Sequence, residues 1–400
     1  MQNLWSLNCP EYFWRTKPQF PDCVWEEAVR NSLPILNLDN QPEDIDAILQ
    51  LILGEDQFGT NHWDLGFAKK TYYVLKPVLP RILTNYMRNS FHKIPEKKFR
   101  LNWPTEDRYA KFLWEVIRQV MIISKSSKIE YINFWPNNYK FAFVLTHDVE
   151  TGKGFDYVNK VADLEEGLGF RSSFNFVPER YPIDLRTFTD LVNRGFEIGL
   201  HGLKHDGKLF NSRKIFQNRA AKINNYLLNY DMVGFRSPLT IRQPEWMQDL
   251  NIKYDSSFFD TDPFEPIPGG TMSVWPFFIG RFIELPYTLI QDHTLTTVLG
   301  EKTPHLWSKK IDFIKNYHGL ALINTHPDYL RQTDSNWQIY CEFLNQMKEQ
   351  DNYWHALPKE IAEWWRIRSR VNNGEIKSDP SINVKSYGQI SLHGTSIELA

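Results

Sequence analysis

Two clusters of ionisable residues are candidates for chemistry. Thr146-His147-Asp148-Val149-Glu150 ends the apolar run that starts at Phe141, and His201-Gly202-Leu203-Lys204-His205 follows a second apolar run. Histidines four residues apart lie on one side of a helical turn and can reach the same metal ion. Two imidazoles and one carboxylate leave a coordination position open, as in catalytic metal sites. Together, the clusters indicate a divalent metal that binds water or a carbonyl oxygen.

The first cluster offers more than one carboxylate. Side chains alternate along a strand, so Asp148 and Glu150 would share one face and His147 would take the other. Such a pair suits a metal ligand beside a general base. Simpler alternatives are that a carboxylate caps a following helix, and that the two histidines of the second cluster occupy a surface turn.

Three more strand ends carry candidate side chains. Arg236, in Gly234-Phe235-Arg236-Ser237-Pro238, has a planar fork that can hold a carboxylate. Asp255 can orient a catalytic histidine, and His326 has an ordinary pKa suited to protonating a leaving amine. The structural alternatives are a surface arginine, a turn-capping aspartate and a histidine packed in a turn.

All five clusters follow short apolar segments that alternate with helical patterns. We expect strands at 141–146, 173–177, 196–200, 233–235, 252–254, 282–285 and 320–325, and helices at 156–168, 184–194, 209–229 and 307–317. This alternation favours parallel strands joined by crossover helices, either in a doubly wound sheet or in a barrel. In both folds, functional side chains gather at the carboxyl ends of the strands.

No catalytic motif is found outside the segment 138–345. Residues 1–137 are irregular with helical patterns, so we expect a mainly helical N-terminal extension of mixed character. Helical patterns recur at 334–349 and 357–370, and weak alternation over 390–399 suggests a small hairpin or a loose end. We therefore expect an extension (1–137), a catalytic domain (138–345) and a C-terminal helix and tail (346–400).

Composition narrows the class of partner and the compartment. The 46 Lys and Arg residues nearly balance 48 Asp and Glu residues, which argues against a nucleic-acid partner held by charge. Three scattered cysteines argue against a disulfide framework and favour a reducing compartment. We see no signal peptide and no transmembrane run, so we expect a soluble, cytoplasmic protein.

The five clusters, in this order and each after an expected strand, resemble the motifs of the polysaccharide deacetylase family, or NodB homology domain (carbohydrate esterase family four). The resemblance covers about 138 to 345 and implies a distorted (β/α) barrel of about seven parallel strands. It implies Asp148 as general base, Arg236 holding this base, and His326 as general acid assisted by Asp255. It also implies His201 and His205 as metal ligands.

Two positions depart from the family pattern. Val149 stands where a second, metal-binding aspartate is usual, so Glu150 becomes the expected third ligand. The alternative is that Asp148 binds the metal and Glu150 or His147 acts as base. Gly202 stands where the family has Ser or Thr between the two histidines. Zinc is the expected ion, with Co²⁺, Mn²⁺ or Ni²⁺ as alternatives.

The resemblance implies hydrolysis of an N-acyl group, typically N-acetyl, on a sugar or polysaccharide precursor. The absence of an export signal favours a nucleotide- or lipid-linked carbohydrate as substrate. Alternatives are a deformylase or other amide hydrolase on the same fold, and a non-catalytic carbohydrate-binding module on a degenerate deacetylase fold.

Overall fold

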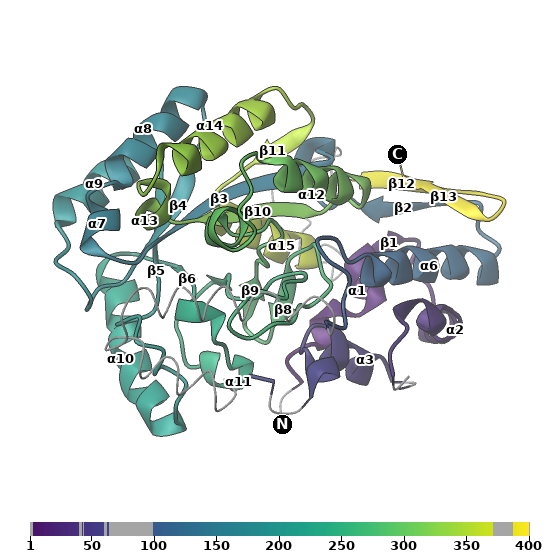
Figure 1. Ribbon diagram of the computed structural model, residues 1–400. Helices are drawn as coiled ribbons and strands as arrows, with labels where there is room; N and C mark the ends of the chain where they lie inside the picture. Colours follow the sequence, from purple (N-terminus) through teal and green to yellow (C-terminus); the bar gives the residue numbers. More distant parts are fainter. Residues whose placement is uncertain are drawn as a thin grey trace.

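The computed structural model describes residues 3–39, 42, 44–59, 62–63, 99–370 and 387–399. A curled, mostly parallel sheet with helices around it forms the larger part of the molecule (Figure 1). The strand order is β10-β3-β4-β5-β6-β7-β9-β8, and β11 also pairs with β3. The strands are β3 (Phe141–Val149), β4 (Ser172–Phe176), β5 (Glu197–Leu200), β6 (Gly234–Phe235), β7 (Tyr254–Asp255), β8 (Phe277–Ile279), β9 (Phe282–Glu284), β10 (Leu320–Thr325) and β11 (Tyr353–His355).

The sheet is a distorted (β/α) barrel, as expected. All pairings within it are parallel except that of β8 with β9. The segment after β9 approaches the other end of the strand order, since the backbone N–H groups of Thr288 and Leu289 donate to Leu322 O at 3.1 and 3.0 Å. Because parallel strands share their carboxyl-end edge, the residues that follow them converge at one end of the barrel.

Helices connect the strands and cover the sheet. They are α7 (Gly152–Phe155), α8 (Val158–Leu168), α9 (Leu185–Asn193), α10 (Arg213–Asn229), α11 (Pro244–Met247), α12 (His305–Asn316), α13 (Pro327–Leu330), α14 (Asp334–Lys348) and α15 (Pro358–Arg370). Side chains of Asp184, Ser212 and Thr333 cap α9, α10 and α14 by accepting backbone N–H bonds. The cap at Ser212 explains why α10 begins later than residue 209, where the sequence pattern starts.

The described residues of the N-terminal extension are mainly helical and contribute to the same apolar core as the barrel. The helices of the extension are α1 (Pro10–Trp14), α2 (Asp22–Ser32), α3 (Ile45–Ile52) and α6 (Arg108–Ile123). Trp114 of α6 stacks on Trp275 of the barrel with ring centroids 5.6 Å apart. Apolar residues on one side of α6, such as Phe112, Val116 and Val120, are fully buried, which is the stripe expected of a packed helix.

A small antiparallel sheet joins the extension to the C-terminal residues. Its order is β1-β2-β12-β13, and its strands are β1 (Thr16–Lys17), β2 (Lys128–Ile132), β12 (Tyr387–His393) and β13 (Ser396–Leu399). The hairpin expected within 390–399 is present as β12 and β13. Within the described residues, no helix is long and apolar enough to cross a lipid bilayer.

A buried ion pair also joins the extension to the barrel. Glu55 follows α3, Arg242 precedes α11, and both side chains are 0% exposed. Arg242 Nε donates to Glu55 Oε2 at 3.0 Å, and its guanidinium lies over the rings of Phe258 and Phe259. Glu55 Oε1 accepts the backbone N–H of Gly270 at 2.7 Å. The extension is therefore fixed to the barrel by directional contacts as well as by apolar packing.

Candidate metal centre

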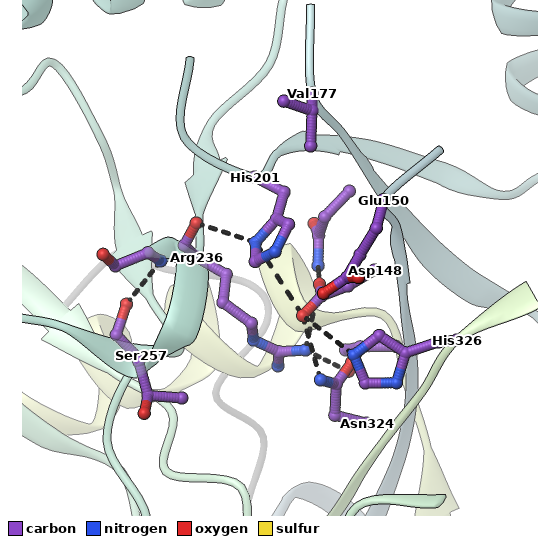
Figure 2. Close-up of polar contacts among 12 residues, drawn as sticks. Asp148, Glu150, Val177, His201, Arg236, Ser257, Asn324 and His326 are labelled. Atoms are coloured by element: carbon purple, nitrogen blue, oxygen red, sulfur yellow. Dashed lines mark hydrogen bonds and ion pairs between the residues drawn. The ribbon is translucent and has the colours of Figure 1, made fainter. Parts of the chain in front are cut away.

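Asp148 lies near the carboxyl end of β3 and is held on several sides (Figure 2). Asn175 Nδ2 donates to Asp148 Oδ1 at 3.0 Å, and Asn324 Nδ2 donates to Asp148 Oδ2 at 2.9 Å. Arg236 Nη1 lies 3.4 Å from Asp148 Oδ1, the contact expected from the sequence. These donors come from β4, β10 and the end of β6, so the barrel converges on one carboxylate.

The surroundings of Asp148 keep it ionised. Burial alone would raise the pKa of this carboxyl, but the positive charges of Arg236, His201 and His326 and the amide of Asn175 outweigh it and lower the pKa to about 2. Asp148 is therefore an anionic acceptor at any pH at which the protein is expected to work.

His147 points away from this cluster, as strand alternation predicts. Its Nε2 lies 2.7 Å from Glu165 Oε1 and its Nδ1 lies 2.7 Å from Thr325 Oγ1. The ring is fully buried and stacks on Phe174. His147 thus has a structural environment, and the alternative in which it acts as base has no geometric support.

Glu150, His201 and His205 form a set of three potential metal ligands. One ligand atom from each lies within 4.8 Å of the others. The Nδ1 of His201 lies 3.1 Å from Arg236 O, which orients the ring and leaves Nε2 free. Among the described residues, neither imidazole Nε2 has a hydrogen bond of acceptable geometry, although His205 Nε2 lies 2.9 Å from Glu150 Oε1. Orphaned buried nitrogens beside a carboxylate are what a divalent ion would satisfy, so these residues fit the metal that the resemblance implies.

The protonation states also suit metal binding. Burial opposes ionisation of Glu150, but the charges of His205, His326 and His201 hold its pKa well below the ordinary value. Burial lowers the pKa of His201 to about 4. A neutral imidazole and an ionised carboxylate are the forms that bind a metal ion.

Backbone conformation explains the glycine between the two histidines. Gly202 has a φ of 64°, and a Cβ at this position would lie 2.5 Å from Cδ of Pro238, in the Arg236-Ser237-Pro238 motif. A serine or threonine would therefore be strained and would collide with the third motif. His205 has a φ of 51°, a conformation that non-glycine residues adopt rarely.

His326 follows β10 and faces Asp148, with its Nε2 4.0 Å from Asp148 Oδ2. Its Nδ1 lies 2.7 Å from Asp292 Oδ1, and its backbone N–H donates to Asp292 Oδ2 at 2.8 Å. Burial would lower the pKa of His326, but Asp292, with help from Glu150 and Asp148, raises it to about 10. The imidazole is therefore a protonated donor at neutral pH.

The expected pairing of Asp255 with His326 is wrong, because Asp292 occupies that place. Asp255 Oδ1 instead accepts a hydrogen bond from Ser257 Oγ at 2.8 Å. Asp255 also stands opposite Glu284 in the register of β7 and β9. Burial raises the pKa of both carboxyls, and the charge of Asp255 adds to the rise for Glu284. Asp255 belongs to a buried acidic pair behind the site.

No protein-family model and no curated protein matches the chain. Among solved structures, the chain resembles a "putative polysaccharide deacetylase" from Mycobacterium smegmatis, with a TM-score of 0.49 and 16% identity over 59% of this chain and 94% of that one. It also resembles Puue allantoinase, with a TM-score of 0.45 and 14% identity over 58% and 92% of the two chains.

A third similar structure is the peptidoglycan deacetylase PdaC from Bacillus subtilis, with a TM-score of 0.38 and 13% identity over 61% of this chain and 100% of that one. Polysaccharide and peptidoglycan deacetylases are thus among the structures that the chain resembles. With TM-scores below 0.5, these likenesses leave the activity to be argued from the side chains.

Sequence reasoning missed three residues of the site. Asn175 stands opposite Asp148 in the register of β3 and β4, and Asn324 precedes His326 by two residues on β10. Polar residues at such positions in buried strands are a usable signal, because the side chain must find a partner. Asp292 had no such signal, since it lies at the start of a short helical stretch between β9 and α12 and not on a strand.

Proposed function

We propose that this protein is a metal-dependent hydrolase that removes an N-acyl group, in the first instance N-acetyl, from a sugar. The main observation in support is that Glu150, His201 and His205 lie together, beside an ionised Asp148 and a protonated His326. One site thus combines a ligand set, a proton acceptor and a proton donor. These are the parts that hydrolysis of an unreactive amide requires.

Glu150, His201 and His205 would hold the ion, with zinc expected and Co²⁺, Mn²⁺ or Ni²⁺ as alternatives. When bound, such an ion polarises the amide carbonyl and lowers the pKa of water in the site. Val149 is fully buried in β3, so the third ligand comes from Glu150 and not from the position of the family's second aspartate.

Asp148 accepts the proton of the attacking water. Its low pKa makes it a weak base towards ordinary water, so this role depends on a water that is already acidified. The carboxylate is kept ionised and fixed in place by Asn175, Asn324 and Arg236. The polar groups around it therefore need not reorient during the reaction.

His326 donates a proton to the leaving nitrogen, because an amine leaves poorly without one. Its Nε2 is 4.0 Å from Asp148 Oδ2, so proton acceptor and donor lie side by side over one substrate position. Asp292 holds the opposite nitrogen of the ring and is a positioning residue. Water enters and the C–N bond breaks, giving a free acid and an amino sugar.

We further propose a carbohydrate precursor as substrate, with the sugar linked to a nucleotide or a lipid. Near balance of charge, at 46 basic and 48 acidic residues, supports a compact ligand rather than nucleic acid. His205 and Glu150 are the partly exposed members of the ligand set, so the substrate would enter from their side.

The first experiment compares metal content by mass spectrometry in the native protein and in His201→Ala/His205→Ala. A matched control is His305→Ala/His393→Ala, which removes two exposed histidines. We expect about one ion per native chain and per control chain, and none in the site variant. The native protein and the control variant should release acetate from N-acetylated sugars, and the site variant should not. A native chain that binds no ion after resupply of metal would reject the proposal.

A further inference from the structure

A second polar site lies between the N-terminal extension and α15. Half of the residues that line the pocket are aromatic, from α1, α6, α15 and the segment around β8, and the lining includes two arginines, Arg15 and Arg368. Arg15 ends α1 in a left-handed conformation with a φ of 50° and a ψ of 60°. Leu7 and Tyr12 at its rim are exposed, so the pocket can be reached from solvent.

Arg15 is a buried charge that forms no ion pair with a described carboxylate, although the charge of the more distant Glu11 acts on it. Arg15 as a residue is only 5% exposed to solvent. Within the part of the chain that the structure describes, its guanidinium makes no hydrogen bond and no ion pair, and its one ring contact is with Tyr12 at 5.5 Å. Burial lowers the pKa of Arg15 to about 10. An isolated buried charge of this kind is costly unless something pairs with it.

Arg368 adds a second guanidinium to the same pocket. It is 2% exposed and donates from Nε to Asn133 O at 3.1 Å and from Nη2 to Phe13 O and Ile132 O at 2.6 and 3.0 Å. Over the described ranges, its Nη1 has no acceptor and no carboxylate pairs with it. Burial and the charge of Arg15 hold its pKa well below the ordinary value.

We propose that this pocket binds a compact oxyanion, with the phosphate group as its prototype, between Arg15 and the free Nη1 of Arg368. Planar guanidinium forks match the oxygens of phosphate, sulfate and carboxylate groups. One anion would satisfy the unpaired donors of both side chains and offset the repulsion between them. Aromatic walls exclude water and strengthen the attraction.

The oxyanion pocket is separate from the metal centre. Trp275 lines the pocket, and its Nε1 donates to Tyr317 O and His318 O, which precede β10. His326 follows β10 at the opposite end, and a six-residue strand spans roughly 20 Å. The anion is therefore not the reacting group of a substrate, and it would stabilise the junction of the extension with the barrel.

The test measures binding of inorganic phosphate by calorimetry and thermal unfolding, at an ionic strength matched with chloride. Arg15→Gln is compared with Arg186→Gln, which removes an arginine whose side chain is 92% exposed. We expect saturable one-to-one binding and a raised Tm in the native protein and in Arg186→Gln. Affinity should fall at least tenfold in Arg15→Gln, and in Arg15→Met, which keeps the apolar stem.

A further measurement, of phosphate binding to a variant without the two ligand histidines, excludes binding at the metal centre. Phosphate should bind His201→Ala/His205→Ala as it binds the native protein, so this proposal and the proposed function fail independently. Without phosphate, Arg15→Met should be at least as stable as the native protein, because it removes an uncompensated charge. Equal phosphate affinity in the native and Arg15 variants, or no saturable binding of phosphate, sulfate or acetate to the native protein, would overturn the proposal.

Discussion

The carboxylate of Asp292 accepts two hydrogen bonds from His326, one from its backbone N–H at 2.8 Å and one from its ring Nδ1 at 2.7 Å. The two contacts fix the position and the orientation of the ring, so that the N–H group at Nε2 faces Asp148. Asp255, the aspartate expected in this role, is engaged with Ser257 instead.

The pH dependence of activity should respond to Asp292. His326 has a pKa raised to about 10, so it is protonated at neutral pH and its donor function is lost as pH rises through that value. In Asp292→Asn the pKa of His326 falls, and the alkaline limb of the kcat profile moves to lower pH. Titration of the His326 ring nitrogens by NMR measures the shift directly. Asp255→Asn is the control, and identical titrations in all three proteins would contradict the assignment.

Glu150 and Asp148 should separate into ligand and base. Glu150→Gln removes a charged ligand, so we expect metal content to fall with activity. Asp148→Asn keeps the hydrogen-bonding shape and should retain the ion while kcat falls by about 10²–10⁴. Metal content and initial rates, measured on the same preparations, show which residue is the ligand and which is the base. Loss of the ion in Asp148→Asn alone would reverse the two roles.

Gly199 makes room for Asn175. A Cβ at Gly199 would overlap Asn175 Oδ1, so Gly199→Ala should displace this amide from Asp148 and lower kcat about tenfold. Gly167→Ala is the matched control, because no atom lies within 4 Å of its added Cβ and it should stabilise α8 by about 0.5–1 kcal/mol. Thermal unfolding and kcat are measured for both. If Gly199→Ala is as active as Gly167→Ala, Asn175 does not position Asp148.

The Glu55–Arg242 pair should be strongly coupled. Glu55→Gln leaves Arg242 buried without its counter-charge, and we expect a loss of about 3–5 kcal/mol in the free energy of unfolding. In Glu55→Gln/Arg242→Met, which removes both charges, most of that loss should be recovered. Urea unfolding of the single and double variants measures the coupling, and additive losses would show that the pair is not a unit.

Glu197 should make stability fall as pH rises. Burial raises its pKa to about 7, although Tyr254 Oη donates to it at 2.7 Å. Between about pH 4.5 and 7 the folded protein binds a proton that the unfolded chain has lost, so the free energy of unfolding declines by about 3 kcal/mol over this range. Glu197→Gln should lack this decline. Urea unfolding at pH 5 and pH 8 compares the two proteins, and parallel changes would contradict the prediction.

Local patterns were sufficient for much of the barrel. The apolar run Leu320–Thr325 coincides with β10, and the run from Phe141 continues as β3 to Val149. Buried parallel strands have continuous apolar sequences, whereas the helices between them have apolar residues every three or four positions. The motif histidines and Asp148 were found because they follow such segments.

Non-local contacts were beyond the sequence pattern. β2 and β12 pair although more than 250 residues separate them, and neither short segment identifies its partner. The pairing of Asp292 with His326 has the same cause, since it depends on how the segment after β9 returns towards β10. Asp255 was misassigned because its role came from the order of the motifs, whereas its side chain bonds Ser257 and stands opposite Glu284 in the register of β7 and β9.

β11 has a practical consequence for truncation. It pairs with β3 at 141–143, while β4 pairs with β3 at 145–149, so the two strands share one side of β3. A chain shortened at residue 345, the expected end of the catalytic domain, would lack Tyr353–His355 and leave that stretch of backbone unpaired. Because Phe141 and Phe143 lie on this uncovered edge, the shortened protein would expose an apolar edge strand on which other chains can pair and aggregate. Recombinant versions of the barrel should therefore extend at least through α15.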